Sequence, residues 1–136
     1  MKNKTVICLI LVSVLAACSG KTNESNSPSG SSQKLPSGRE IVVTGINEMK
    51  LQNGQTGLIF NYQTKIPMED RDKLRSEVEE IWSTFRYDVE KAKADAGVIR
   101  ATHVEDDGLL IKNGKGYGFV YEKDAEGKWH LDEDKK

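Results

Sequence analysis

The sequence predicts an α+β domain, a two-layer sandwich in which one long helix lies on an antiparallel sheet. From residue 67 to residue 97, apolar residues recur every three or four positions, which is the period of a helix with one buried face. On both sides of this segment, short stretches rich in β-branched and aromatic residues are separated by glycine-containing turns, as is typical of strands. The expected order is therefore a β-hairpin, the helix and then a β-meander.

The predicted hairpin begins with a strand from Glu40 to Asn47, where isoleucine, valine and threonine are concentrated. Alternation of apolar and polar residues continues towards Asn53-Gly54, a dipeptide that favours a tight turn because both residues tolerate positive φ. The segment from Leu58 to Thr64 alternates in the same way. We therefore expect two antiparallel strands joined near Asn53-Gly54.

The predicted helix begins at Pro67, because the first helical position makes no use of a backbone N–H. Its apolar residues form a single stripe, which Trp82 widens; the stripe consists of Leu74, Val78, Ile81, Phe85, Val89, Ala92 and Ala96. Gly97 is expected to close the helix as a left-handed cap. A helix of about 28 residues would be about 42 Å long, so it would overhang a small sheet or bend. The favoured interpretation packs the stripe on the sheet; the alternative is a seam between two copies.

The strands after the helix are short and separated by turns that contain glycine. Their predicted ranges are Val98 to Val104, Leu109 to Lys112, Tyr117 to Lys123 and Lys128 to Leu131, with turns at Asp106-Asp107-Gly108, Asn113-Gly114 and Glu126-Gly127. This pattern predicts an antiparallel meander.

The N-terminal segment has the charge and hydropathy order of a secretory signal peptide. Lys2 and Lys4 precede an apolar run from Val6 to Ala17, which is shorter than the roughly 20 apolar residues that a membrane-spanning helix needs. The run ends in Leu15-Ala16-Ala17-Cys18, which resembles the lipobox of bacterial lipoproteins at all four positions.

This resemblance implies that the Cys18 thiol receives a diacylglyceryl group, that the signal is cleaved between Ala17 and Cys18, and that the new N-terminus is usually acylated too. In Gram-negative members of the family, serine after the cysteine usually implies transfer to the outer membrane, so Ser19 predicts that location if the organism has one. The domain would then lie on its periplasmic face or at the cell surface. An ordinary secretory signal with a chance cysteine is the alternative.

The rest of the chain divides by composition. Serine, glycine, asparagine and proline dominate the segment after Cys18, and Leu35 is its single aliphatic residue, so it cannot bury enough apolar surface to order itself. The predicted organisation is a signal peptide at residues 1–17, a lipidated N-terminus with a disordered tether at 18–38, the α+β domain at 39–132 and a charged tail at 133–136.

Charge and cysteine content exclude several classes of function. The formal net charge of −1 becomes two units more negative when Lys2 and Lys4 leave with the signal, and together with export this argues against nucleic acid as a partner. Cys8 leaves with the signal and Cys18 is lipidated. The mature protein is therefore expected to have no disulfide, no thiolate nucleophile and no cysteine metal site.

The residues that suggest chemistry at first sight form no recognisable motif. Gly114, Gly116 and Gly118 lead into a predicted strand rather than a helix, so we expect a bulge or close strand packing instead of a phosphate loop. The only two histidines, His103 and His130, lack the i, i+4 helical spacing of a recognisable zinc motif. No catalytic residue, cofactor or metal site is assigned.

The aromatic residues of one predicted strand are the candidate binding surface. Tyr117, Phe119 and Tyr121 share one face because side chains alternate along a strand. The favoured interpretation places this face under the helix. If Val120 faced the helix instead, the three aromatics would form an exposed contact surface for a partner or a sugar chain.

Taken together, these patterns predict a membrane-anchored lipoprotein whose small non-catalytic domain binds an envelope protein or polymer. The alternative is a small enzyme or inhibitor that acts on envelope polymers through His103 or His130; a third class is a purely structural envelope protein. The stretch from Ile81-Trp82 to Gly127-Lys128-Trp129 resembles uncharacterised small bacterial proteins, and this likeness implies no activity.

Overall fold

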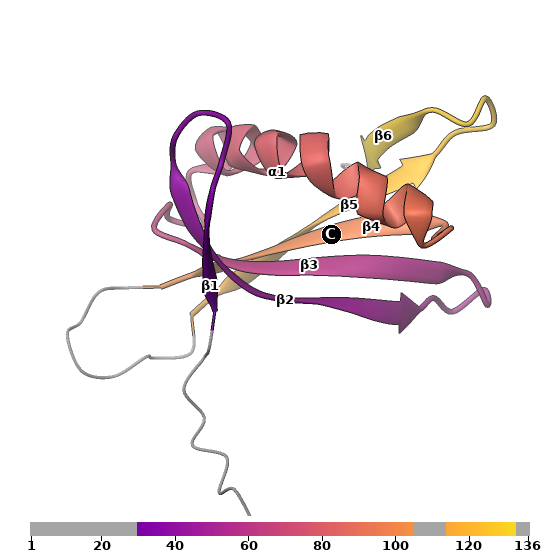
Figure 1. Ribbon diagram of the computed structural model, residues 1–136, viewed down its shortest axis with the longest axis horizontal. Coiled ribbons are helices and arrows are strands. Elements are labelled where there is room, and N and C mark those ends of the chain that lie inside the picture. Colours follow the sequence, from indigo (N-terminus) through magenta and orange to yellow (C-terminus); the bar gives the residue numbers. More distant parts are fainter. Residues whose placement is uncertain (1–29, 105–113, 133–136) are drawn as a thin grey trace, which may run out of the picture.

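The computed structural model describes residues 30–104 and 114–132, in which one helix lies across one face of a six-stranded sheet (Figure 1). The strands are β1 (Ser31–Lys34), β2 (Glu40–Lys50), β3 (Thr56–Thr64), β4 (Ala96–His103), β5 (Gly116–Lys123) and β6 (Trp129–Asp132), and the helix is α1 (Arg71–Lys91). The strands follow one another across the sheet in chain order. The predicted α+β sandwich of one helix on a sheet is confirmed.

One pair of strands in this sheet is parallel. β3 and β4 run in the same direction, whereas every other neighbouring pair is antiparallel. The reason is the connection: α1 carries the chain back across the sheet, so β4 starts at the same end as β3. The prediction of an entirely antiparallel sheet was wrong at this pair.

The hairpin predicted around Asn53-Gly54 is confirmed. β2 and β3 pair antiparallel from Lys50 opposite Thr56, and Gly54 has a φ of 81° in the turn between them. A register shift between Val43 and Gly45 marks a bulge in β2. The hairpin at the other end of the chain, around Glu126-Gly127, is also present and joins β5 to β6.

Both ends of the helix differ from the prediction. The first helical residue is Arg71, not Pro67; Asp70 is the N-cap, and its side chain accepts a hydrogen bond from the Lys73 amide at 3.4 Å. At the other end the left-handed residue is Lys93, with a φ of 54°, and Gly97 lies inside β4. Ala96 is the last residue of the predicted apolar stripe, but it pairs with Gly57 of β3. The chain has therefore entered the sheet before the predicted end of the helix. With 21 residues α1 is about 32 Å long, shorter than the predicted helix of about 42 Å.

The apolar stripe of the helix packs on the sheet of the same chain, as the favoured interpretation expects. Its buried residues are Leu74, Glu77, Val78, Ile81, Trp82, Phe85 and Val89. They meet the side chains that β3, β4 and β5 direct to this face, including Phe60, Tyr62, Ile99 and Phe119. Within residues 30–104 and 114–132, no helix has the length and apolar character needed to cross a membrane.

The end of the predicted tether is folded, which corrects that prediction. Ser31–Lys34 pairs antiparallel with the start of β2, and the Leu35 side chain is buried in the core. An edge strand is held by backbone hydrogen bonds, so it needs no apolar pattern of its own. The turn that follows stands beside the first half of α1 in Figure 1. There the Ser37 amide donates to Glu80 Oε2 at 3.0 Å.

Several predicted features lie outside the described residues. They are the signal peptide with Ala17 and Cys18, the first part of the tether, the turn at Asp106-Asp107-Gly108, the strand from Leu109 to Lys112 and the charged tail at 133–136.

Candidate binding site

The aromatic face of β5 points towards the helix, as the favoured interpretation predicted. Phe119 and Tyr121 are buried in the core, whereas Tyr117 is only partly buried. The prediction that this face lies under the helix is confirmed for the first two residues. Tyr117 is more exposed than Phe119 and Tyr121 because the two ends of the interface between α1 and β5 are built differently.

At the end where α1 finishes, three aromatic rings close the interface, and we call Trp82, Tyr121 and Trp129 the aromatic stack. The Trp82 and Tyr121 rings are parallel with centroids 4.0 Å apart, and Trp129 meets Trp82 edge-on at 5.3 Å. Trp129 Nε1 also donates to Glu90 Oε1 at 3.0 Å. This bond ties β6 to the last part of α1.

A glycine in β4 makes room for the aromatic stack. A Cβ atom at Gly97 would lie 2.6 Å from Trp82 Cζ3, closer than two such atoms can approach. The backbone of β4 therefore forms the floor on which the indole lies. This contact, rather than a helix cap, explains glycine at position 97.

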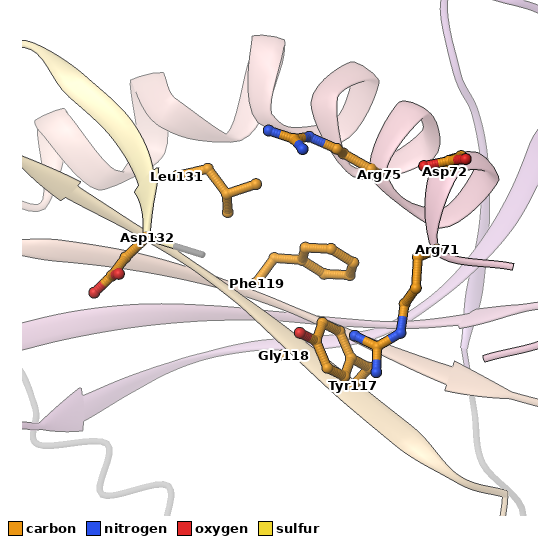
Figure 2. A pocket seen from close by; sticks show the side chains of 8 residues that line it. All are labelled: Arg71, Asp72, Arg75, Tyr117, Gly118, Phe119, Leu131 and Asp132. Atoms are coloured by element: carbon orange, nitrogen blue, oxygen red, sulfur yellow. The ribbon is translucent and has the colours of Figure 1, made fainter. Parts of the chain in front are cut away.

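At the opposite end, where α1 begins, the same two elements separate and leave a cleft of about 190 Å³ (Figure 2). We call it the arginine cleft; α1 supplies Arg71, Asp72 and Arg75, β5 supplies Tyr117, Gly118 and Phe119, and β6 supplies Leu131 and Asp132. Two members of the predicted aromatic surface, Tyr117 and Phe119, thus line a hollow rather than a flat exposed face. Sequence patterns could not show that hollow, because its walls come from elements some 40 to 60 positions apart in the chain.

Stacked planar groups form one side of the arginine cleft. The Arg71 guanidinium lies over the Tyr117 ring, 3.8 Å from its centroid, and the Tyr117 and Phe119 rings meet edge-on at 4.9 Å. Figure 2 shows Phe119 and Leu131 pointing into the space below α1, while the Asp132 side chain points away from Phe119. The interior is therefore apolar and aromatic, and the helical wall carries two guanidinium groups and the Asp72 carboxylate.

The position of Arg71 on the helix is not favourable for the helix itself. It is the first residue of α1, where the positive end of the helix dipole favours acids and opposes cations. Arg71 forms no salt bridge with any described residue, and its contact is the Tyr117 ring. Arg75, one turn later, contacts Glu79 with Nε 3.5 Å from Oε1. Both arginines line the cleft, together with Asp72 of α1 and Asp132 of β6.

A buried hydroxyl lies near this wall of the helix. Burial raises the pKa of Tyr121 to about 12, and the charge of Glu79 adds to the increase while that of Arg75 opposes it. The hydroxyl oxygen has no hydrogen-bond partner in the described part of the chain. Tyr121 therefore stays protonated at neutral pH and contributes packing rather than base chemistry.

A second polar group, which the sequence analysis missed, lies beneath the turn between β1 and β2. Glu77 is only 1% exposed, and its Oε2 lies 3.2 Å from Arg39 Nη1. Burial, followed by the charge of Glu77, raises the pKa of the neighbouring Tyr62. The sequence does contain an indication that Glu77 is buried, because this residue falls three positions after Leu74, within the buried stripe of the helix. This group fastens the β1–β2 turn to the helix.

The two histidines do not meet. His103 ends β4, and His130 on β6 pairs with Glu122, which in turn pairs with Ala96 at the other end of β4. His103 Nδ1 is buried without a hydrogen-bond partner among the described residues, whereas His130 is exposed. In the same part of the chain, no three side chains of histidine, cysteine, aspartate or glutamate are grouped to hold a metal ion.

The three glycines before the aromatic residues differ in what their surroundings require. A Cβ at Gly114 would lie 1.9 Å from the His103 carbonyl oxygen, so close strand packing explains that glycine, as predicted. A Cβ at Gly118 would lie no closer than 3.9 Å to any atom outside its immediate neighbours, at Val98 Cγ1. Packing within the described chain therefore does not require glycine at position 118.

The residues of the arginine cleft are charged, aromatic and aliphatic. The arginine cleft holds two arginines, two aspartates, two aromatic rings and an aliphatic side chain, and its lining residues include no serine, threonine, cysteine or histidine. The chain matches no known family model, and comparisons with curated proteins and with solved structures likewise find no significant match.

Proposed function

We propose that this protein is a lipoprotein, anchored to a bacterial envelope membrane through Cys18, whose α+β domain binds an envelope protein or polymer at the arginine cleft. The observation that supports a binding role is the composition of this cleft, which combines the Arg71 guanidinium, the Tyr117 ring and Phe119. Such groups recognise a partner by charge and stacking and carry out no bond chemistry of their own.

The proposed anchor is supported by the four-position match of Leu15-Ala16-Ala17-Cys18 at the end of an apolar run. Each buried methylene of an acyl chain stabilises membrane attachment by about 0.8 kcal/mol, so two or three chains hold a protein firmly where one chain holds it marginally. Ser19 after the cysteine supports an outer-membrane location in a Gram-negative host.

The anchor is tested by comparing Cys18→Ala with Cys8→Ala, which removes a cysteine from the same apolar segment. We expect the wild type and Cys8→Ala to label with radioactive palmitate and to sediment with membranes. Cys18→Ala should do neither, and intact-mass analysis should show an unlipidated chain. A Cys18→Ala protein that stayed firmly in the membrane fraction would refute the proposed anchor.

The alternative of a small envelope enzyme depends on the histidines, and His103 and His130 lie at opposite ends of β4 and its neighbours. A double variant, His103→Asn with His130→Asn, separates the two functions. A binding domain should still restore the phenotype of a deletion strain when it carries both changes, whereas an enzyme that uses either histidine should lose that ability.

A further inference from the structure

Two carboxylates of α1 attach the turn between β1 and β2 to the helix. Glu77 and Glu80 lie three positions apart, so their side chains leave the same side of α1. Glu77 Oε2 lies 3.2 Å from Arg39 Nη1, and Glu80 Oε2 accepts a hydrogen bond from the Ser37 amide at 3.0 Å. The turn stands beside the first half of the helix (Figure 1). We call these two contacts the carboxylate latch.

The turn is closed by its own backbone hydrogen bonds. The Leu35 amide donates to the Arg39 carbonyl and the Gly38 amide donates to the Leu35 carbonyl, both at 2.8 Å. The turn can therefore leave the helix without losing its shape. Besides the latch, the described contacts that hold β1 and the turn are the four pairs between β1 and β2 and the buried Leu35 side chain. The four residues of β1 are exposed and add little packing.

The Glu80 contact depends on an ionised carboxylate. The hydrogen bond from Ser37 lowers the pKa of Glu80 below its ordinary value of 4.5, because the folded state favours the charged form. The stability that this contact contributes is therefore complete above pH 4.5 and is lost as the pH falls through the lowered pKa.

The Glu77 contact is a buried ion pair with one exposed partner. Glu77 is 1% exposed, and its Oε1 has no hydrogen-bond partner in the described part of the chain, so Arg39 is the group that offsets its charge. The Arg39 side chain is 42% exposed. Once Glu77 is neutral, the attraction ends and the guanidinium can move into water, where a cation is well solvated.

The other titratable groups around the latch do not take over these contacts. On β3, burial and then the charge of Glu77 raise the pKa of Tyr62, so its hydroxyl stays protonated throughout the acid range. On α1, Lys73 lies one turn before Glu77 and is paired with Asp70 at 2.6 Å. On the turn itself, Arg39 faces both carboxylates.

We propose that the carboxylate latch is an acid-sensitive device, which frees the β1–β2 turn and β1 from the rest of the fold when Glu77 and Glu80 are protonated. At neutral pH both carboxylates hold the turn on α1. In acid the turn leaves the helix, and β1 then depends on its four backbone pairs and on Leu35. The apolar residues that α1 buries against β3, β4 and β5 carry no charge, so that part of the core keeps its packing.

Release would lengthen the connection between the fold and a membrane. At full extension, residues 31–39 would add about 30 Å to the chain that precedes β2, at 3.3–3.6 Å per residue. This consequence rests on the proposed anchor at Cys18. The release itself does not, so the experiment below can fail without the anchor failing.

Hydrogen exchange followed by mass spectrometry measures the release, on the full-length chain purified in detergent. Protection of residues 31–39 is compared with that of β3 and β4 at neutral pH and at about pH 3.5, below the ordinary pKa of glutamate, after correction for the direct effect of pH on exchange. We expect protection of residues 31–39 to fall by about tenfold or more in acid, while β3 and β4 keep theirs. Loss of protection in all segments together, or in none, would overturn the proposal.

A glutamine variant and its matched control identify the buried carboxylate. Glu77→Gln keeps the shape of the side chain without its charge, so protection of residues 31–39 should already be about tenfold lower at neutral pH. The control is Glu79→Gln, because Glu79 is a neighbour on the same helix that contacts Arg75 rather than the turn. Its exchange should match that of the wild type. Equal protection in the two variants would overturn the proposal.

A second variant tests the exposed carboxylate. Glu80→Gln keeps an oxygen that can accept the Ser37 amide but does not titrate, so its protection should fall less in acid than that of the wild type. Melting temperatures at neutral pH show whether each variant is folded. If Glu77→Gln is not, the Glu80 variant decides, and an acid response identical to that of the wild type would overturn the proposal.

Discussion

The two ends of the interface between α1 and β5 are built from the same pair of elements and differ in what fills the space between them. At the end of the aromatic stack, Trp82 and Tyr121 lie 4.0 Å apart over a glycine backbone. At the end of the arginine cleft, Arg71 reaches only the rim and a hollow of about 190 Å³ stays open. The comparison separates two roles: one end supplies packing, and the other is where we propose that a partner binds.

Among the variants that test this comparison, Trp82→Ala should lower the stability of the fold the most. The substitution removes the central ring of the aromatic stack and leaves a cavity against Gly97 and Tyr121. We expect the free energy of unfolding to fall by about 3–5 kcal/mol, measured by urea denaturation. A loss below about 1 kcal/mol would show that the closed end does not carry the stability assigned to it.

A side chain at position 97, beneath the aromatic stack, should also lower the free energy of unfolding, but by less than Trp82→Ala does. Gly97→Ala places a methyl group 2.6 Å from Trp82 Cζ3, so the indole or the strand must move. The expected loss is about 1–3 kcal/mol, measured in the same way. Gly118→Ala is the matched control at the open end, where the added carbon meets only an ordinary contact, and it should cause no loss.

Alkaline pH should weaken the closed end through Tyr121. Its pKa rises from the ordinary 10 to about 12 in the folded protein, because the phenolate would be buried. The unfolded chain therefore releases its proton first, and stability that is complete below pH 10 is lost as the pH rises through 12. Tyr62 contributes with the same sign, since its pKa is raised too.

The share that belongs to Tyr121 is measured with Tyr121→Phe. This variant keeps the stacked ring and removes a hydroxyl that has no partner among the described residues, so it should be at least as stable as the wild type at pH 7. Its thermal stability should decline less between pH 10 and pH 12. Identical pH profiles for the two proteins would contradict the assignment.

The smallest effect on stability is expected from Arg71→Gln at the open end. Arg71 is exposed and its position opposes the helix dipole, so the free energy of unfolding should change by no more than about 0.5 kcal/mol. The same variant should weaken binding of the proposed envelope partner at the arginine cleft. A large destabilisation would mean that the cation–π contact with Tyr117 is a structural link, and the separation of roles between the two ends would fail.

Local patterns in the sequence predict much of this fold. The turn at Asn53-Gly54, the apolar stripe from Leu74 to Val89 and the shared face of Phe119 and Tyr121 depend on periods and dipeptides that are visible in short windows, and the structure has all three. Glu77 shows the limit of this approach, because a carboxylate in the stripe has no visible partner until Arg39 is brought beside it.

The features that could not be predicted depend on contacts between distant segments. The four residues of β1 are exposed and the strand is held by its pairing with β2, so the sequence contains no apolar period that would indicate a strand there. The helix ends early because β3 pairs with Ala96 and Gly97, and composition alone does not reveal that competition. The arginine cleft needs the start of α1 to lie over residues of β5 and β6, which no local window contains.

The pairing of β1 with β2 also determines how the domain responds to traction. Any pull transmitted along the N-terminal part of the chain enters the domain at Ser31, where a short edge strand meets β2. The first contacts to bear the load are the four residue pairs that join β1 to β2. The burial of Leu35 and the ion pair between Arg39 and Glu77 follow. These contacts can break while the remaining five strands and α1 stay together, so the pairing of β1 with β2 would be the first to yield to a pull from the proposed membrane anchor.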